Sequence, residues 1–288
     1  MQFLYSISRV LIAGAFAGAL AVLTLTLWPD LIGRGEQGLA RVRLAAHDAQ
    51  RVLYAKLGWP LPGTPDLDRL NERLAEKGLA RGAPVFIRIF KRERELELWM
   101  RRGDGFVLFA SYPVCRHSGG LGPKLREGDR QAPEGFYTVG RSQLNPNSAY
   151  RRSFNLGYPN LYDAANGRTG SFLMVHGACL SVGCYAMTDP VIDEIWELVT
   201  AALDRGQKRF SAHIFPFRMS EAHLAIHDRA PWGEFWRDLK RGYDLFEASR
   251  TPPRIGVCAK RYVARSGAAG SYGESELAEL CDQEALRQ

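Results

Sequence analysis

The sequence lacks a long basic arm, an internal repeat and a closed set of Cys-x-x-Cys pairs. Its 38 lysine and arginine residues are scattered, and their clusters at Lys91–Arg94 and Arg101–Arg102 are short. Proteins that follow a nucleic-acid backbone gather basic residues in one stripe or arm, so we expect no nucleic-acid partner. The missing Cys-x-x-Cys pairs argue against a closed structural zinc site.

Composition is otherwise that of a globular protein. Hydrophobic residues make up 46% of the 288 residues and charged residues 24%, so a sizeable core is expected. The length fits one catalytic domain with extensions better than two equal domains. The net charge of +7 indicates either a basic solvated surface or attraction to an anionic partner such as acidic lipid or cell-wall polymer.

One long hydrophobic run stands near the start of the chain. Val10–Trp28 holds 19 residues without a charge and follows Arg9. Such a run spans a bilayer or forms the core of a signal peptide, so residues 1–28 are predicted to be one or the other. Cleavage after Ala21 would leave an apolar mature end, which favours an uncleaved anchor. We therefore expect a periplasmic or cell-envelope protein, held at the inner membrane through residues 10–28.

Residue patterns divide the remainder into three parts. A helical lead-in is expected over residues 29–82, a catalytic domain over 83–220, and a C-terminal helical extension and tail over 221–288. A long loop is expected over Cys115–Gly135. The expected strands are Val85–Phe90, Glu95–Met100, Phe106–Phe109, Phe136–Val139, Ser171–Val175, Phe210–Phe215 and Ile255–Val263. The expected helices are Leu39–Leu53, Leu67–Leu79, Val191–Leu203, Trp232–Phe246 and Glu274–Leu286.

Two reactive side chains, His176 and Cys184, lie on one predicted loop between a strand and a helix. A thiol becomes a nucleophile at neutral pH when a nearby base removes its proton, and imidazole is the usual base. Glycines beside both residues let the backbone approach a substrate, and N–H groups near Gly183 and Cys184 could stabilise an oxyanion. Each residue alone is more often structural, but together they predict a catalytic pair.

Several segments around this pair resemble one protein family. His176-Gly177 followed by Ser181-Val182-Gly183-Cys184 resembles the signature of L,D-transpeptidase catalytic domains, or YkuD domains. The usual signature is His-Gly, a spacer, then Ser/Thr-His-Gly-Cys, so this chain departs from it at Val182 and has a shorter spacer. Further similarity, in part to the YafK-like branch, lies in Gly119–Lys124, Ala132–Tyr137, Gly183–Asp189 and His213–Phe217.

The resemblance implies an α+β fold with a β-sandwich-like mixed sheet. It implies Cys184 as nucleophile, His176 as base and the Gly177 carbonyl as the group that orients the imidazole. Ser181 would match the family's Ser/Thr, with a loop hydrogen bond as the alternative role. The implied substrate is a peptidoglycan stem peptide, attacked at the L-centre carbonyl of meso-diaminopimelate with loss of D-Ala and formation of a thioester. No metal or cofactor is required.

The second half of the implied reaction has more than one outcome. An amine acceptor would give a crosslink or attach a protein lysine, whereas water would give hydrolysis. A member of this family can also cut a diaminopimelate–lysine bond and thereby release a wall-attached lipoprotein. On the long loop, the residues expected to bind the carboxylates of the substrate are Lys124, Arg126 and Asp129, with a solvated loop surface as the alternative role. Asn155 and Tyr158 could line the cleft, with core or turn positions as the alternative role.

The other cysteines allow two disulfides if Cys184 stays free. Cys115 with Cys179 would brace the site and Cys258 with Cys281 would hold the tail, although four cysteines allow three pairings. Cys179 could instead act as a resolving thiol for Cys184.

Two functions from other classes compete with this one. A zinc hydrolase could use His176, Cys179 and Cys184, or His223 and His227, as ligands, but the helical pair lacks the usual neighbouring Glu and is expected to lie at the surface. A non-catalytic wall-binding module is the other alternative.

Overall fold

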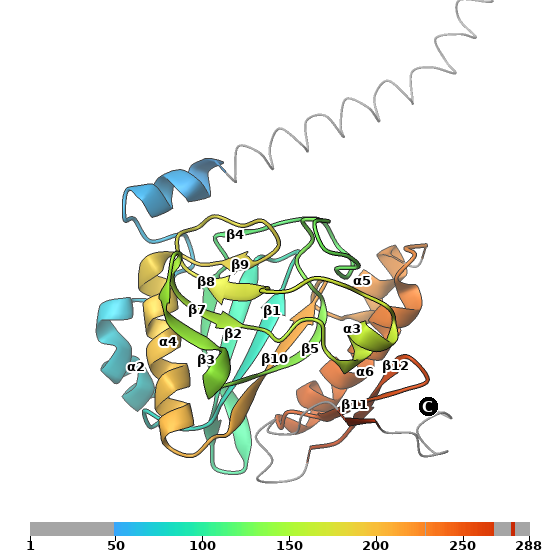
Figure 1. Cartoon of the computed structure of the whole chain (residues 1–288). Coiled ribbons are helices and arrows are strands. Elements are labelled where there is room, and N and C mark those ends of the chain that lie inside the picture. The colour runs from blue at the N-terminus through green and yellow to red at the C-terminus, as the bar shows by residue number, and fades with distance from the viewer. Residues whose placement is uncertain (1–48, 228, 268–277, 280–288) are drawn as a thin grey trace, which may run out of the picture. The chain divides into compact units, whose positions relative to one another are not determined.

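The computed structural model describes residues 49–227, 229–267 and 278–279 (Figure 1). The helices and strands named below belong to the compact unit that spans Arg51–Gln288. The predicted anchor and most of the predicted helix Leu39–Leu53 lie outside the described residues. Residues 51–56 are helical. Within the described part of the chain, no helix has the length and apolarity needed to cross a bilayer.

The first sheet has five strands in the order β3-β2-β1-β10-β5. The predicted antiparallel meander is present, and β1 also pairs in parallel with β10. β1 is buried along its whole length, because Val85, Ile87 and Ile89 point into the main core while Phe86 and Phe90 point into two aromatic clusters on the other face. The strands are β1 Val85–Phe90, β2 Glu95–Arg102, β3 Gly105–Pro113, β5 Gly135–Gly140 and β10 Arg209–Phe215.

The second sheet has five strands in the order β4-β9-β8-β7-β6 and carries the predicted loop of His176 and Cys184. β8 pairs antiparallel with β7 and in parallel with β9. The strand predicted over Ser171–Val175 begins later, at Met174, because Phe172 adopts a left-handed φ of 54° that interrupts extended backbone. The strands are β4 Arg116–His117, β6 Leu144–Ser148, β7 Arg151–Asn155, β8 Met174–His176 and β9 Tyr185–Ala186.

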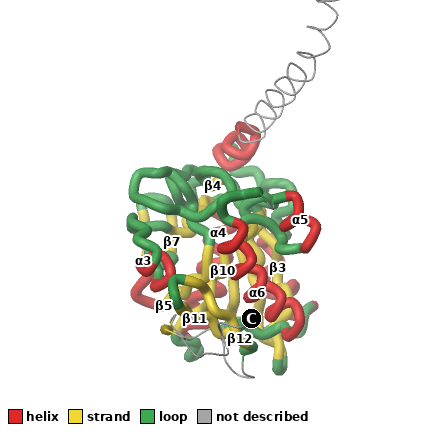
Figure 2. Tube along the Cα trace, turned by 90° about the vertical axis from the view of Figure 1, so that its right-hand side faces the viewer, coloured by secondary structure: helices red, strands yellow, loops and turns green. Residues whose placement is uncertain are grey.

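Helices cover the sheets. α4, Asp189–Asp204, packs its apolar face into the main core, and α6, Gly233–Ser249, contributes to both aromatic clusters. Shorter helices are η1 Leu67–Arg69, α2 Leu70–Glu76, η2 Arg141–Gln143, α3 Leu161–Ala165 and α5 Glu221–Ile226. Loops gather at one end of the sheets, around β4 (Figure 2). The prediction of an α+β fold with mixed sheets is confirmed.

The C-terminal part differs from the prediction in two places. The single strand expected over Ile255–Val263 is a hairpin of β11, Arg254–Cys258, and β12, Arg261–Arg265. Its turn residues Ala259 and Lys260 both have positive φ. Gly and Asn are the residues typical of such a turn, and because neither is present the sequence did not predict it. β13, Ala278–Glu279, pairs with β11, so the helix predicted over Glu274–Leu286 is wrong at these two residues.

Candidate active site

His176 ends β8 with its ring in a defined tautomer. Its Nδ1 lies 2.7 Å from the carbonyl oxygen of Gly177, the contact that the family resemblance implies. A carbonyl can only accept a hydrogen bond, so Nδ1 carries the proton and Nε2 keeps a lone pair. The side chain is buried, and this burial lowers the pKa of His176, while the hydrogen bond to Gly177 acts in the opposite direction. The ring is therefore a neutral base at neutral pH.

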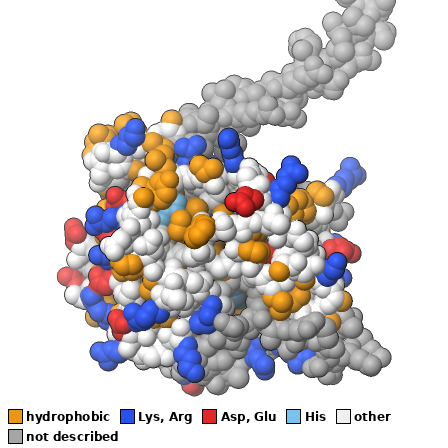
Figure 3. Space-filling model, viewed as in Figure 1, with side chains coloured by type: hydrophobic (Ala, Val, Ile, Leu, Met, Phe, Trp, Pro, Cys, Tyr) orange, Lys and Arg blue, Asp and Glu red, His pale blue; other side chains and the backbone are white. Residues whose placement is uncertain are grey.

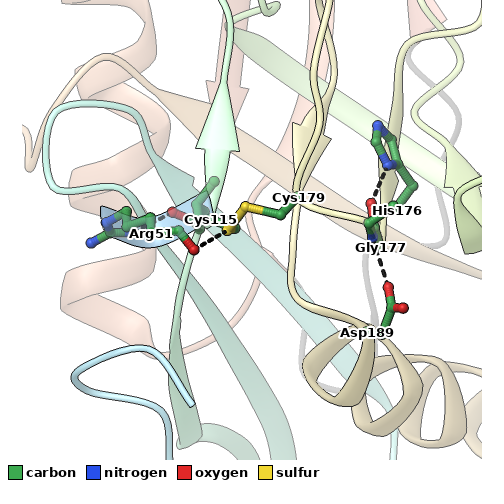
Figure 4. The surroundings of a disulfide bond; sticks show 8 residues. Arg51, Cys115, His176, Gly177, Cys179 and Asp189 are labelled. Atoms are coloured by element: carbon green, nitrogen blue, oxygen red, sulfur yellow. Dashed lines mark hydrogen bonds between the residues drawn. A yellow bond between two sulfur atoms is a disulfide. The ribbon is translucent and has the colours of Figure 1, made fainter. Parts of the chain in front are cut away.

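Gly177 is held between two elements that leave no room for a side chain. A Cβ atom there would lie 2.6 Å from Asp189 Oδ1 and 2.8 Å from Arg151 Cβ. The Gly177 N–H donates to the Tyr150 carbonyl at 3.0 Å. The next N–H, of Ala178, donates to Asp189 Oδ1 at 2.7 Å, and Figure 4 shows Asp189 beside Gly177. The backbone that orients His176 is thus fixed by hydrogen bonds from the β6–β7 turn and from the first turn of α4.

Cys184 precedes β9 and is a free, half-buried thiol. Its sulfur accepts a hydrogen bond from the Met174 N–H at 3.4 Å, and its S–H donates to the Phe172 carbonyl at 3.7 Å. Burial raises the pKa of Cys184, while the Met174 hydrogen bond and the charge of Lys124 act to lower it. The resting site therefore pairs a neutral thiol with a neutral imidazole, and the thiol needs a base to react.

Backbone pairing brings the segment that contains Cys184 alongside the strand that ends at His176. His176 pairs with Ala186, and Cys184 lies two residues before Ala186. Cys184 itself lies in the bend before β9, and its sulfur accepts the N–H of Met174, which lies two residues before His176 on β8. No hydrogen bond joins the two side chains in the described part of the chain, because the Nδ1 side of the ring faces Gly177 and the thiol faces Phe172.

Ser181 and Gly183 shape the loop between these two residues. Ser181 Oγ donates to the Cys184 carbonyl at 2.7 Å and lies 3.0 Å from Ser118 Oγ, so it links the reactive loop to the long loop after β4. These contacts match the loop hydrogen bond foreseen as its alternative role. Gly183 has a φ of 118°, a conformation that a residue with a Cβ rarely adopts.

A disulfide braces the reactive loop. Cys115 and Cys179 are bonded, with their Cα atoms 5.3 Å apart, which is the pairing hypothesised for them among the three that four cysteines allow (Figure 4). The bond is buried against Leu61 and half-buried residues of the lead-in. Cys179 is thereby removed as a thiolate ligand for zinc and as a free resolving thiol. Cys258 is disulfide-bonded too, and its predicted partner Cys281 lies outside the described residues.

The long loop is organised by two of its predicted substrate-binding residues. Lys124 is buried, and its Nζ donates to Asp129 Oδ1 at 2.6 Å and to the Arg126 carbonyl at 2.8 Å. The other Asp129 oxygen accepts the N–H groups of Leu125 and Arg126. Both charged side chains therefore hold the loop, whereas the exposed Arg126 points its guanidinium at no partner among the described residues.

Asn155 and Tyr158 occupy turn and core positions. Asn155 ends β7, and its Oδ1 accepts the Gly157 N–H at 2.9 Å, as in an Asx turn. Tyr158 is buried, and its hydroxyl lies 3.3 Å from the Lys124 carbonyl. Burial raises the pKa of Tyr158, so its hydroxyl is a neutral donor. Both residues support the walls of the site through the backbone of neighbouring loops.

A buried ion pair explains the glycine-rich segment before Lys124. Lys91 and Glu134 are fully buried 3.1 Å apart, and Lys91 Nζ also donates to the carbonyls of Gly120 and Gly122. Glu134 accepts the Gly122 N–H at 2.7 Å and the indole N–H of Trp236 at 2.8 Å. The pair therefore ties the long loop to the first sheet and to α6.

The histidines proposed as zinc ligands face an aromatic side chain. The rings of His223 and His227 pack on Phe217, with centroid distances of 5.8 and 4.9 Å. His223 Nδ1 also lies 2.7 Å from the Arg218 carbonyl. The described ranges contain no group of three or more metal-ligating side chains.

Sequence reasoning missed Tyr150 and the role of Asp189. Asp189 was expected only at the start of a helix, whereas its carboxylate also fixes the Ala178 N–H. Tyr150 lies in a turn of a hairpin, β6–β7, that was not predicted, because Asn145, Pro146 and Asn147 carry no strand signal. An aromatic residue at an exposed turn is the one signal that could have singled it out.

Exposed apolar residues lie on the two loops that lead to Met174 and to Cys184. Phe172, Leu180 and Val182 are 73%, 52% and 76% exposed, and all three lie on the loops that flank β8. Apolar side chains are visible on the face of the molecule that carries this sheet (Figure 3). Val182 stands where the family signature has a histidine, so the mouth of the site is more apolar than the signature implies.

Comparisons with known proteins agree with these features. The model of the L,D-transpeptidase catalytic domain, YkuD, matches residues 84–210. The chain is 48% identical over 197 residues to the L,D-transpeptidase-family protein YafK of Escherichia coli K12, which covers 68% of this chain and 80% of that protein.

Solved structures are more distant. The helical cell shape determining protein Pgp2 of Campylobacter jejuni matches with a TM-score of 0.39 and 20% identity, over 63% of this chain and 65% of that one. Bd1075 of Bdellovibrio bacteriovorus matches with a TM-score of 0.33 and 21% identity, over 57% of this chain and 60% of that one. The chain thus covers slightly less than two thirds of each of these structures.

Proposed function

Because the chain belongs to the L,D-transpeptidase catalytic domain family, we propose that it is a cysteine-dependent enzyme that acts on peptidoglycan stem peptides. Cys184 is the nucleophile and His176 the general base. The observation that carries this proposal is the hydrogen bond from His176 Nδ1 to the Gly177 carbonyl, which leaves Nε2 unprotonated at the end of β8, the strand whose Met174 N–H contacts the Cys184 sulfur.

The first half of the reaction forms a thioester. His176 Nε2 takes the proton of Cys184 as the sulfur attacks the L-centre carbonyl of meso-diaminopimelate. The tetrahedral intermediate places its negative oxygen near the backbone N–H groups of Gly183 and Cys184. It collapses with cleavage of the amide bond, and the protonated His176 returns its proton to the departing D-Ala nitrogen. Proton and leaving group balance without a cofactor.

The second half resolves the thioester. His176 removes a proton from the incoming nucleophile, which attacks the thioester carbonyl and releases the Cys184 sulfur. A wall amine gives a crosslink, a protein lysine gives an attached protein, and water gives a shortened stem. The same residues could attack the diaminopimelate carbonyl of a diaminopimelate–lysine bond, release the lysine amine of a wall-attached lipoprotein, and free Cys184 when water attacks the thioester.

Substrate binding falls to the exposed part of the long loop. The Arg126 guanidinium is the group best placed to bind a stem-peptide carboxylate, because it is exposed and has no protein partner in the described ranges. Lys124 contributes its charge near the thiol, and Asp129 keeps Lys124 in place. Asn155 and Tyr158 act through the loops they hold, and Ser181 through the carbonyl of Cys184.

Peptidoglycan as substrate puts the enzyme in the cell envelope. The proposed organisation keeps residues 1–28 as signal peptide or inner-membrane anchor, 29–82 as lead-in, 83–220 as catalytic domain and 221–288 as C-terminal extension. The anchor would hold the catalytic domain on the wall side of the membrane.

The test is mass spectrometry of products made by the full chain and by a Cys184→Ala variant. The substrates are disaccharide tetrapeptide and a muropeptide with a lysine remnant. Cys184-dependent exchange or dimers establish a transpeptidase, whereas loss of the lysine remnant without dimers establishes a hydrolase that detaches protein. Activity lost with a chelator and retained by Cys184→Ala would support a zinc enzyme. Absence of any product would leave a wall-binding module.

A further inference from the structure

The turn between β6 and β7 touches the proposed base from a side that the reaction scheme does not use. Ala149 and Tyr150 form this turn, and Tyr150 is 43% exposed. Its ring lies against the buried imidazole of His176, with centroids 4.9 Å apart and planes inclined by 34°. An exposed tyrosine that covers a buried histidine separates the histidine from solvent.

The backbone of the same residue holds the group that orients the imidazole. The Tyr150 carbonyl accepts the Gly177 N–H at 3.0 Å, and the Gly177 carbonyl in turn accepts the hydrogen bond from His176 Nδ1. Tyr150 therefore acts on the ring twice, once through direct contact and once through Gly177.

The turn itself is anchored to α4. Arg151 binds Asp193 in a bidentate manner, with distances of 3.2 and 2.7 Å, and its φ of 68° is unusual for a residue with a side chain. The Ser148 hydroxyl accepts the Tyr150 N–H at 3.1 Å. Left-handed backbone at a non-glycine residue costs energy and persists where surrounding contacts enforce it, often beside functional sites.

We propose that Tyr150 is a positioning residue for His176: it covers the imidazole and fixes Gly177, so that the proton-accepting nitrogen stays desolvated and in one orientation. The inference rests on the proposed role of His176 as base. The physical consequence is a change in acid–base behaviour, because burial is what holds the pKa of His176 below its ordinary value of 6.5.

The other ionisable groups around the imidazole have their own partners. Asp189 of α4 lies behind Gly177 and accepts the Ala178 N–H. Arg151 of the turn binds Asp193, and Cys184 on the adjacent loop contacts Met174 and Phe172. Removal of the Tyr150 ring therefore changes solvent access to His176 while these ion pairs and hydrogen bonds remain.

The experiment measures the rate of Cys184 alkylation by iodoacetamide across pH in the full, unreduced chain, with peptide mapping to assign the label. In Tyr150→Ala the imidazole gains solvent and its pKa rises toward 6.5, so more of the base is protonated on the acid side. We expect the acid limb of the profile to move to higher pH and the rate there to fall about three- to tenfold, as a pKa rise of roughly 0.5 to 1 gives.

Four further variants make the result specific. Tyr150→Phe keeps the ring and should match wild type, as should Asn147→Ala in the neighbouring exposed strand. His176→Ala should remove the limb that the imidazole sets and leave only the rise at higher pH that the thiol's own ionisation gives. If Tyr150→Ala does not melt cooperatively, Tyr150→Gln tests the same loss of cover. If the folded Tyr150→Ala variant keeps the acid limb of wild type while His176→Ala loses it, the inference about Tyr150 is overturned and the proposed role of His176 stands. An unchanged profile in His176→Ala would instead overturn the proposed catalytic pair.

Discussion

At the residue scale, Gly177 shows why the residue after His176 is a glycine: neighbouring elements leave no space for a side chain. The turn before β7 and the first turn of α4 close on it from two sides, and its carbonyl orients the His176 ring. The sequence suggested a glycine for close approach of substrate, whereas the structure shows close approach of the protein's own elements. The glycine therefore serves the position of the base.

Replacement of Gly177 by alanine should damage both stability and activity. The added Cβ would lie 2.6 Å from Asp189 Oδ1 and 3.0 Å from Ile192 Cγ2, so α4 or the turn must shift. We expect a loss of about 1–3 kcal/mol in the free energy of unfolding, together with slower alkylation of Cys184. Urea unfolding and iodoacetamide kinetics measure the two effects, and an alanine variant equal to wild type in both would contradict this account.

His213 makes stability depend on pH. Burial and the charge of Arg88 lower its pKa to about 3, from an ordinary value of 6.5. Between these values the unfolded chain binds a proton that the folded protein does not, so stability falls as pH falls below about 6.5, by about 1.4 kcal/mol per pH unit. His213→Phe, placed among Phe86 and Phe136, should reduce this slope. Urea unfolding at a series of pH values measures it, and an unchanged slope would refute the assignment.

At the scale of elements, the reactive loop depends on its disulfide. The Cys115–Cys179 bond joins the segment after β3 to the loop that carries Cys184, across a sequence separation of 64. A disulfide that closes a loop of this size lowers the conformational entropy of the unfolded chain, which stabilises the folded protein by about 4 kcal/mol. The bond also fixes one end of the loop whose other end bears the nucleophile.

The paired variant Cys115→Ser with Cys179→Ser should fold less stably, by up to about 4 kcal/mol, and should react more slowly with substrate. Thiol titration of denatured, unreduced wild type should find one thiol, Cys184. Five thiols would show that the chain carries no disulfide, and full activity of the paired variant would show that the loop needs no brace.

Elements of the first sheet were predictable because each strand alternates or is apolar throughout. Val85–Phe90 and Arg209–Phe215 carry dense β-branched and aromatic residues that leave little choice. β6 and β7 were missed because Asn145–Asn147 resemble a turn, and their pairing with β8 comes from tertiary contacts. The β11–β12 turn was missed because Ala259 and Lys260 adopt positive φ without glycine.

At the scale of the whole molecule, the C-terminal extension shares the core of the catalytic domain. α6 and β12 pack Trp236 and Tyr262 against the first-sheet residues Phe136 and Phe215. Glu134, in a segment shared with the family, receives a hydrogen bond from Trp236. The long loop of the site therefore depends on residues beyond 220.

A chain ending at Ser220 should consequently not fold cooperatively. It would expose Phe90, Phe136 and Phe215, each at a cost of about 1.5–3 kcal/mol, and would leave the buried Lys91–Glu134 pair open to solvent. Near-ultraviolet circular dichroism and thermal melting test this: the shortened chain should show no near-ultraviolet signal and no cooperative unfolding transition. A soluble fragment with a sharp melt would show that residues 221–288 are a separable extension.

The candidate site was predictable from sequence where chemistry is local. His176, Gly177 and Cys184 lie within nine residues, and the free thiol followed from counting cysteines. Roles that depend on the folded structure were not predictable. Lys124 and Asp129 were expected to bind substrate, but in the structure they form an ion pair with each other within the loop. Tyr150 could be linked to His176 only once the hairpin was known.

The central claim is a covalent intermediate on Cys184, and trapping it is the most direct test. The full chain is incubated with disaccharide tetrapeptide, quenched in acid and digested, and the mass of the peptide that contains Cys184 is measured by mass spectrometry. The account predicts a hydroxylamine-sensitive adduct with the mass of the acyl donor less D-Ala, absent from Cys184→Ala. Turnover of the same substrate by Cys184→Ala, or an adduct on another residue, would contradict it.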